Sequence, residues 1–154
     1  MKKIILSLTI SAALLSSIAT FAADKKPGVT EPGTIVRQAF TKEFAQIKDV
    51  QWTTLSKEGV YEAKFIFNNE DLQAFFSEEG DFLGTTRQIQ KSQLPIVVVT
   101  ELEKQYAGVR VATIFEYSKK DGLAYYITLA SDKGAMVVKA NGNGELSVYK
   151  KNVQ

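Results

Sequence analysis

The sequence contains neither cysteine nor histidine, and each absence narrows what the protein can do. Without cysteine there is no disulfide to stabilise the fold and no thiol to act as a nucleophile. Without histidine the commonest base at neutral pH is missing, and the usual nitrogen and sulfur ligands of zinc are missing with it. Catalysis by Ser-His-Asp or Cys-His arrangements is therefore excluded, and we expect a protein that is not an enzyme and that binds no cofactor.

An uncharged, largely apolar run occupies the N-terminus. Lys2 and Lys3 precede it, and the small residues Thr20 and Ala22 offer a cleavage site before Ala23. This pattern is typical of a secretory signal peptide. The run approaches the roughly 20 residues that cross a bilayer, but its serine and threonine residues make it a poor membrane anchor. We therefore predict a signal peptide over residues 1–22, a flexible Pro- and Gly-containing leader over 23–33, and a periplasmic product that does not stay in the membrane.

The mature chain carries no net charge. Removing Lys2 and Lys3 takes the 19 basic residues to 17, which equals the 17 acidic residues. A neutral chain has no general attraction to nucleic acid or to anionic lipid, so neither is an expected partner. The remaining length of about 130 residues is enough to bury a core without disulfides.

One pattern, a helix followed by four strands, occurs twice, over residues 34–89 and 94–151. Corresponding positions lie at a steady offset: Phe40 and Phe44 match Leu102 and Tyr106, Tyr61 and Phe65 match Tyr125 and Leu129, and Gly80 matches Gly144. A period of about 60 residues is too long for a solenoid repeat and indicates a duplicated half-domain.

In the first copy Thr34 can cap a helix whose apolar residues are three and four positions apart, namely Val36, Ala39, Phe40, Phe44 and Ile47. Four strands are predicted after it, around Val50–Thr54, over 60–67, around Leu72–Phe76 and over 82–89. Turns at 57–59, 68–69 and 78–81 separate them. Trp52 has the strand parity of Val50, which favours the core over a contact surface.

In the second copy the β-branched residues 96–99 locally favour a strand. Pro95 and the stripe of Leu94, Val98, Leu102 and Tyr106 favour a helix instead, and we predict a helix here. Strands are predicted over 109–118, 123–130, 134–140 and 145–151, separated by turns that are rich in Gly, Asp and Asn.

These landmarks resemble those of PepSY-like, beta-lactamase-inhibitor-like domains, a family of exported bacterial proteins. The positions that carry the resemblance are Val50, Trp52, Tyr61, Ala63, Phe65, Gly80, Leu94, Pro95, Tyr106, Tyr125, Ile127, Leu129 and Gly144. The resemblance spans residues 34–151. It implies an α+β fold, a tandem duplication of a helix plus four-stranded antiparallel sheet unit, with the helices on one sheet face and the other face open.

The candidate site residues are apolar and aromatic side chains on that open face. Tyr126 and Tyr149 have the parity opposite to Tyr125 and Ile127. Together with Ile66, Phe75 and Val137 they would form an amphipathic platform suited to a protein or peptide partner. The alternative is that they only cover the sheet or contact a second copy of the chain.

Three polar clusters have simpler interpretations. The acidic groups at 70–71 and 78–81 fall at predicted turns and lack the spacing of a calcium loop. The glycine-rich segment 141–145 is followed by no helix and lacks the lysine of a phosphate-binding loop. We interpret all three as turns, and we predict no metal site.

Two functions remain open. The first is a non-catalytic exported binding module, inhibitory if the resemblance extends to activity, that holds an unidentified protein or peptide on the open sheet face. The second is a structural or envelope-stress protein that only self-associates. A large exposed aromatic patch with few charges would favour the first function, and a symmetric self-contact over that patch would favour the second.

The exported product should begin near Ala23, because the basic start, the short apolar run and the small residues at 20 and 22 are the features that signal peptidases require. N-terminal sequencing of the protein recovered from the periplasm checks this. Recovery of a chain that still begins at Met1 would contradict it.

Overall fold

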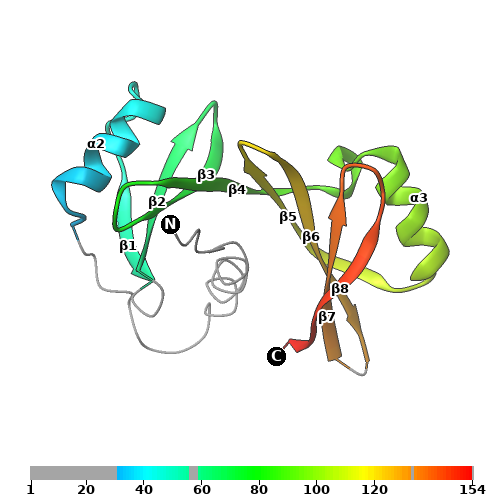
Figure 1. Cartoon of the computed structure of the whole chain (residues 1–154). Helices are drawn as coiled ribbons and strands as arrows, with labels where there is room; N and C mark the ends of the chain where they lie inside the picture. The colour runs from blue at the N-terminus through cyan, green and yellow to red at the C-terminus, as the bar shows by residue number, and fades with distance from the viewer. Residues whose placement is uncertain (1–30, 56–58, 133, 154) are drawn as a thin grey trace, which may run out of the picture. The chain divides into compact units, whose positions relative to one another are not determined.

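The structure is a computed structural model that describes residues 31–55, 59–132 and 134–153. The predicted signal peptide and most of the predicted leader lie outside the described residues. The elements in chain order are α2 (Thr34–Glu43), β1 (Gln51–Leu55), β2 (Val60–Phe67), β3 (Glu70–Ser77), β4 (Phe82–Ile89), the 3-10 turn η1 (Lys91–Gln93), α3 (Ile96–Gln105), β5 (Arg110–Lys119), β6 (Gly122–Ser131), β7 (Gly134–Asn141) and β8 (Leu146–Val153) (Figure 1). Each predicted helix and strand is present, with ends that differ by only a few residues.

The eight strands form a single antiparallel sheet in the order β1 to β8. The predicted tandem of helix plus four-stranded units is therefore wrong. The reason is the pairing of β4 with β5, in which Thr85–Ile89 run antiparallel to Ile114–Ser118. This ladder satisfies backbone groups that two separate sheets would leave exposed at an edge. Only β1 and β8 have a single neighbouring strand.

The chain nevertheless divides into two compact units. Of the described residues, the first comprises 31–55, 59–65 and Phe75–Leu83, and the second comprises Ile66–Ala74, 84–132 and 134–153. Each unit has one α-helix and its own buried residues.

An aromatic cluster forms the core of the first unit. The ring of Phe40, on α2, lies 5.1 Å from Phe44, 5.4 Å from Trp52, 5.3 Å from Phe65 and 6.0 Å from Phe76, measured between centroids. Most of these pairs are edge-to-face, the geometry that the ring quadrupole favours. Trp52 is only half-buried, but its contacts with Phe40 and Phe76 place it in the core.

Helix α2 is shorter than the sequence pattern indicates. Gly33 is its N-cap and no side chain caps it, so Thr34 is the first helical residue and not the predicted cap. The helix ends at Glu43, and Phe44 follows as the C-cap. Ile47 consequently lies beyond the helix, although Val36 and Phe40 are buried as predicted.

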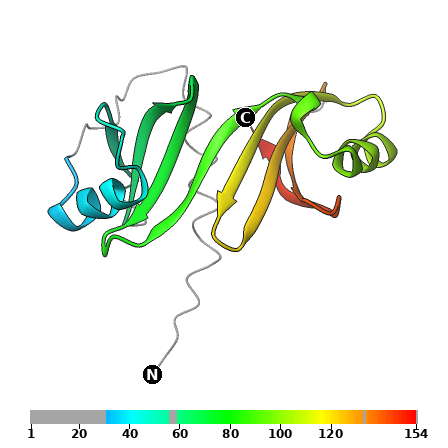
Figure 2. The ribbon, with the colours of Figure 1, turned by 90° about the horizontal axis from the view of Figure 1, so that it is seen from above.

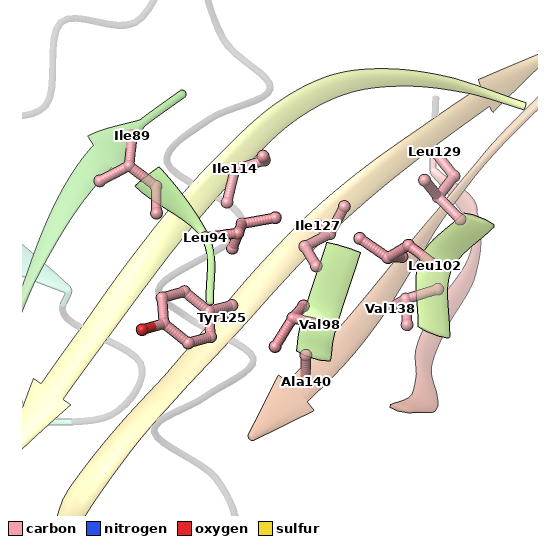
Figure 3. Packing of buried hydrophobic residues seen from close by; sticks show 10 residues of the cluster. All are labelled: Ile89, Leu94, Val98, Leu102, Ile114, Tyr125, Ile127, Leu129, Val138 and Ala140. Carbon is pink, nitrogen blue, oxygen red and sulfur yellow. The ribbon is translucent and has the colours of Figure 1, made fainter. Parts of the chain in front are cut away.

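The core of the second unit forms where α3 packs on the sheet (Figure 2). Val98 and Leu102 of α3 are buried among residues of β4 to β7 and the segment before the helix, namely Ile89, Leu94, Ile114, Tyr125, Ile127, Leu129, Val138 and Ala140 (Figure 3). The β-branched residues of 96–99 are helical because burial of Val98 outweighs their local preference for a strand.

Two glycines at corresponding places allow turns to approach the helices. Gly80 has φ +85°, and a Cβ there would lie 2.8 Å from Cγ2 of Ile35 on α2. Gly144 has φ +88°, and a Cβ there would lie 3.1 Å from the carbonyl oxygen of Val97 on α3. A larger residue at either position would be strained by the positive φ and would also crowd the helix. The predicted correspondence of Gly80 and Gly144 thus has a physical basis.

The central strands are buried on both faces. Ala74–Ser77 of β3 are four consecutive buried residues, and so are Ala124–Ile127 of β6. Since side chains alternate between faces, consecutive burial means that both faces are covered there. The expectation of an open face over the whole sheet is therefore wrong.

Phe65→Ala should lower the free energy of unfolding by about 3 to 5 kcal/mol, because Phe65 is 4% exposed and packs on Phe40 and Phe44. Urea denaturation measures the change. Phe67→Ala is the matched control: Phe67 is 43% exposed, and its loss should cost about 1 kcal/mol or less. Equal effects of the two substitutions would contradict the assignment of the core.

Candidate functional site

The five predicted contact residues differ widely in exposure. Ile66 is 65% exposed and Tyr149 is half-buried, whereas Tyr126 is 3% exposed, and Phe75 and Val137 are likewise buried. The expectation that all five are exposed is therefore wrong for Phe75, Tyr126 and Val137. Phe75 belongs to the first unit and the other four to the second, so the structure does not define one patch from all five.

Strand registers assign the faces of the second unit. Tyr125 and Ile127 pack under α3, so Tyr126 between them points to the opposite face. Tyr126 lies directly across from Phe115 on β5 and from Lys139 on β7. These three residues therefore share one face, as the parity argument predicted for Tyr126. We call the side of β5 to β8 opposite α3 the tyrosine face.

Three tyrosine rings lie together on this face. The ring centroid of Tyr126 is 6.5 Å from that of Tyr117 and 5.0 Å from that of Tyr149, both edge-on, at 67° and 79°. The Lys139 ammonium lies 5.9 Å from the centroid of the Tyr126 ring. These neighbours contribute to the burial of Tyr126. Tyr126 thus supports the face from within, and Tyr149 is its more accessible ring.

A break in the strand register positions Tyr149. Val137 pairs with Lys150 and Val138 pairs with Val148, which leaves Tyr149 as an extra residue on β8. A β-bulge of this kind redirects a side chain out of strict alternation. It lets Tyr149 reach Tyr126.

Burial raises the pKa of Tyr117, so its phenol keeps its proton at neutral pH.

Two of the three polar clusters, at 78–81 and 141–145, are turns as predicted, whereas Glu70 and Asp71 are the first residues of β3, so the prediction of a turn there is wrong. Asn141 closes the glycine-rich segment, because its Oδ1 accepts from the backbone N–H groups of Asn143 and Glu145 and its Nδ2 donates to the Glu145 carboxylate. The Asp81 N–H donates to the Ser77 hydroxyl.

Within the described ranges no three His, Cys, Asp or Glu side chains come together as a metal site. In the same ranges no helix has the length and apolar character to span a membrane.

An ion-pair network, which sequence reasoning missed, lies on the α3 side of the sheet. Arg87 on β4 donates from Nε to Glu116 on β5 at 2.8 Å and from Nη1 to Glu70 on β3 at 2.6 Å. These hydrogen bonds raise the pKa of Arg87 further above its ordinary value. The network borders a cleft of about 320 Å³, which is lined by Phe67, Asn68, Glu70, Leu72, Thr85, Thr86, Arg87, Glu116 and Ser118. Because Arg87 binds both carboxylates, no charged side chain that lines this cleft is left unpaired to bind a ligand.

A buried carboxylate, Glu62, is a second feature that sequence reasoning missed. Its side chain is 1% exposed and lies 3.5 Å from the Lys64 ammonium, and its Oε1 has no hydrogen-bond partner within the described residues. Burial raises the pKa of Glu62, and the nearby charge of Lys64 only partly opposes this. Alternation along β2 indicates its face but not its burial, which depends on neighbouring strands.

Comparison with known proteins identifies the fold. No protein-family model matches the sequence, and no curated protein matches it. Solved structures do match: a DUF2874-family protein from Bacteroides uniformis (TM-score 0.71, 14% identity, 78% of this chain and 90% of that one) and a BLIP-like protein from Bacteroides fragilis (0.68, 17%, 82% and 92%). A third, from Bacteroides eggerthii, has a name that proposes a periplasmic location (0.68, 11%, 81% and 94%).

At these identities the likeness shows the fold alone. The chain has the α+β fold of the DUF2874-family and BLIP-like proteins of Bacteroides. This supports the beta-lactamase-inhibitor-like part of the expected resemblance. The PepSY-like part stays a prediction.

Relative to the wild type, Glu62→Gln should raise the free energy of unfolding more at pH 7.5 than at pH 4. With its pKa raised by folding, Glu62 binds a proton more tightly in the folded than in the unfolded chain. The wild type therefore loses stability as pH rises from the ordinary glutamate value toward the raised one, and the variant does not. Urea denaturation at both pH values measures this.

The control for this experiment is Glu103→Gln, which removes a carboxylate from the exposed surface of α3, where it pairs with Lys91. A gain from Glu62→Gln that is the same at pH 4 and pH 7.5 would contradict the assignment of a titrating buried carboxylate.

Proposed function

We propose that the protein is a non-catalytic, exported binding module that contacts a protein or peptide through its tyrosine face. The observation that carries this proposal is the cross-strand row of Phe115, Tyr126 and Lys139, flanked by Tyr117 and Tyr149. Aromatic side chains are enriched at protein interfaces because they supply large contact area at a low cost in side-chain entropy.

The residues of this face divide into contacts and supports. Phe115, Lys139 and Tyr149 are half-buried and would touch a partner. Tyr126 and Val137 are buried and would hold these contacts in place. A rigid support under exposed rings lowers the ordering cost of binding. This reassigns Tyr126 from an anchor to a support.

Export to the periplasm is part of the proposal. It rests on the signal-peptide pattern of residues 1–22. The name of the Bacteroides eggerthii structure is in line with it.

Site-specific photocrosslinking tests the proposal. The photoreactive residue p-benzoylphenylalanine replaces Phe115 or Tyr149 in the mature protein, and in a control it replaces Ile96, which is exposed on α3. In periplasmic extract of the producing bacterium, the first two positions should give the same adduct, and the control should not. Adducts at all three positions, or at Ile96 alone, would contradict the proposal.

Affinity is then measured by calorimetry with the partner that mass spectrometry identifies. Phe115→Ser and Tyr149→Ser together should weaken binding by about 2 kcal/mol, because aromatic side chains at the centre of an interface are typical hot spots. Thermal unfolding of the variant controls for folding. An adduct formed only with the protein itself would support the self-associating alternative and overturn binding to a different partner.

A further inference from the structure

We propose that the tyrosine face binds an acidic segment of its partner, with Arg110, Lys139 and Lys150 as the cationic contacts. This inference rests on the proposed binding function and adds the chemistry of the partner.

Registers place four cations on this one face, and one of them, Lys119 opposite Gly122, is paired with Asp121. The other three are the proposed contacts. Lys139 is opposite Tyr126, and Lys150 is opposite Val137. Arg110 is opposite Ala130, four residues after Tyr126 and hence on the same face. None of the ion pairs formed by the described residues involves these three side chains.

No carboxylate of β5 to β8 shares the face. Between Gly84 and Val153 the acidic residues are Glu101 and Glu103 on α3, Glu116 on the α3 side of β5, and Asp121, Asp132 and Glu145 at turns. Asp71 on β3 has the parity of the tyrosine face, but β3 lies four strands from β7, or roughly 19 Å at ordinary strand spacing. That separation exceeds the Debye length at physiological salt.

Lys139 gives the clearest reason for a carboxylate partner. Its side chain is half-buried, its ammonium lies over the ring of Tyr126, and among the described residues it forms no ion pair. Partial burial of a cation without a counter-ion is unfavourable, and an incoming carboxylate would offset that cost.

A protein segment is favoured over nucleic acid or anionic lipid. The mature chain is neutral overall, so it lacks the general attraction to a polyanion that such binding requires. The cations also lie among aromatic rings, which match apolar side chains beside the carboxylates.

The experiment selects peptides from a random dodecapeptide library displayed on phage against the immobilised mature protein. Peptides should contain Asp and Glu at about twice their frequency in the unselected library or more, beside apolar residues. The triple variant Arg110→Gln, Lys139→Gln, Lys150→Gln should lose this enrichment. The control triple variant Lys42→Gln, Lys91→Gln, Lys104→Gln carries the same charge change on α2, η1 and α3 and should keep it.

Affinity measurements complete the test. The best acidic peptide should bind about tenfold more weakly to the triple variant than to the wild type, and Lys139→Arg should retain most of the binding. Thermal unfolding confirms that each variant is folded.

The outcomes separate this inference from the proposed function. Selected peptides that need Phe115 and Tyr149 but show no preference for Asp and Glu would overturn the acidic partner and leave the binding function standing. If the selection yields no peptide whose binding depends on Phe115 and Tyr149, both the acidic partner and the binding function are overturned. Equal competition by a DNA oligonucleotide or by phosphatidylglycerol vesicles would show a general polyanion site, which also overturns the inference.

Discussion

The ladder between Thr85–Ile89 and Ile114–Ser118 is the constraint on which the rest of the structure depends. It makes the eight strands one sheet, and it also fixes which way each side chain of β5 points. A slip of one residue would exchange the faces of the strand. Glu116 would then move away from Arg87 and bring a carboxylate beside Tyr126. The ion pair on one side and the absence of acid on the other are thus set by the same register.

The two signs of charge are separated in space, although the whole chain has a formal net charge of only +2. From β5 to β8 the acidic residues lie at turns and against Arg87, whereas the charged residues of these strands that share the tyrosine face are cations. Net charge alone therefore describes this molecule poorly, because the two signs are sorted by face. The aromatic rings lie on the cationic side, where an apolar and acidic partner surface would meet both kinds of group.

Local patterns predicted the helices and strands well, because alternation and turn residues act over a few positions. They also separated Tyr125 from Tyr126 correctly. They failed where pairing is distant, as with Arg87 and Glu116, which are 29 residues apart. They failed again on the burial of Tyr126, which involves a ring brought in by the bulge at Tyr149. Candidate contacts were therefore found by parity, but the division into contacts and supports required the sheet.

The strand order has a consequence for how the chain reaches its native state. Every strand pairs with the one that precedes it in the sequence, so no strand waits for a distant partner. Contacts between sequence neighbours form faster than long-range ones. A chain that is synthesised or translocated N-terminus first can extend the sheet strand by strand, each new edge being covered as the next segment arrives. Vectorial growth of this kind shortens the time for which an unpaired edge is open to aggregation before folding ends at β8.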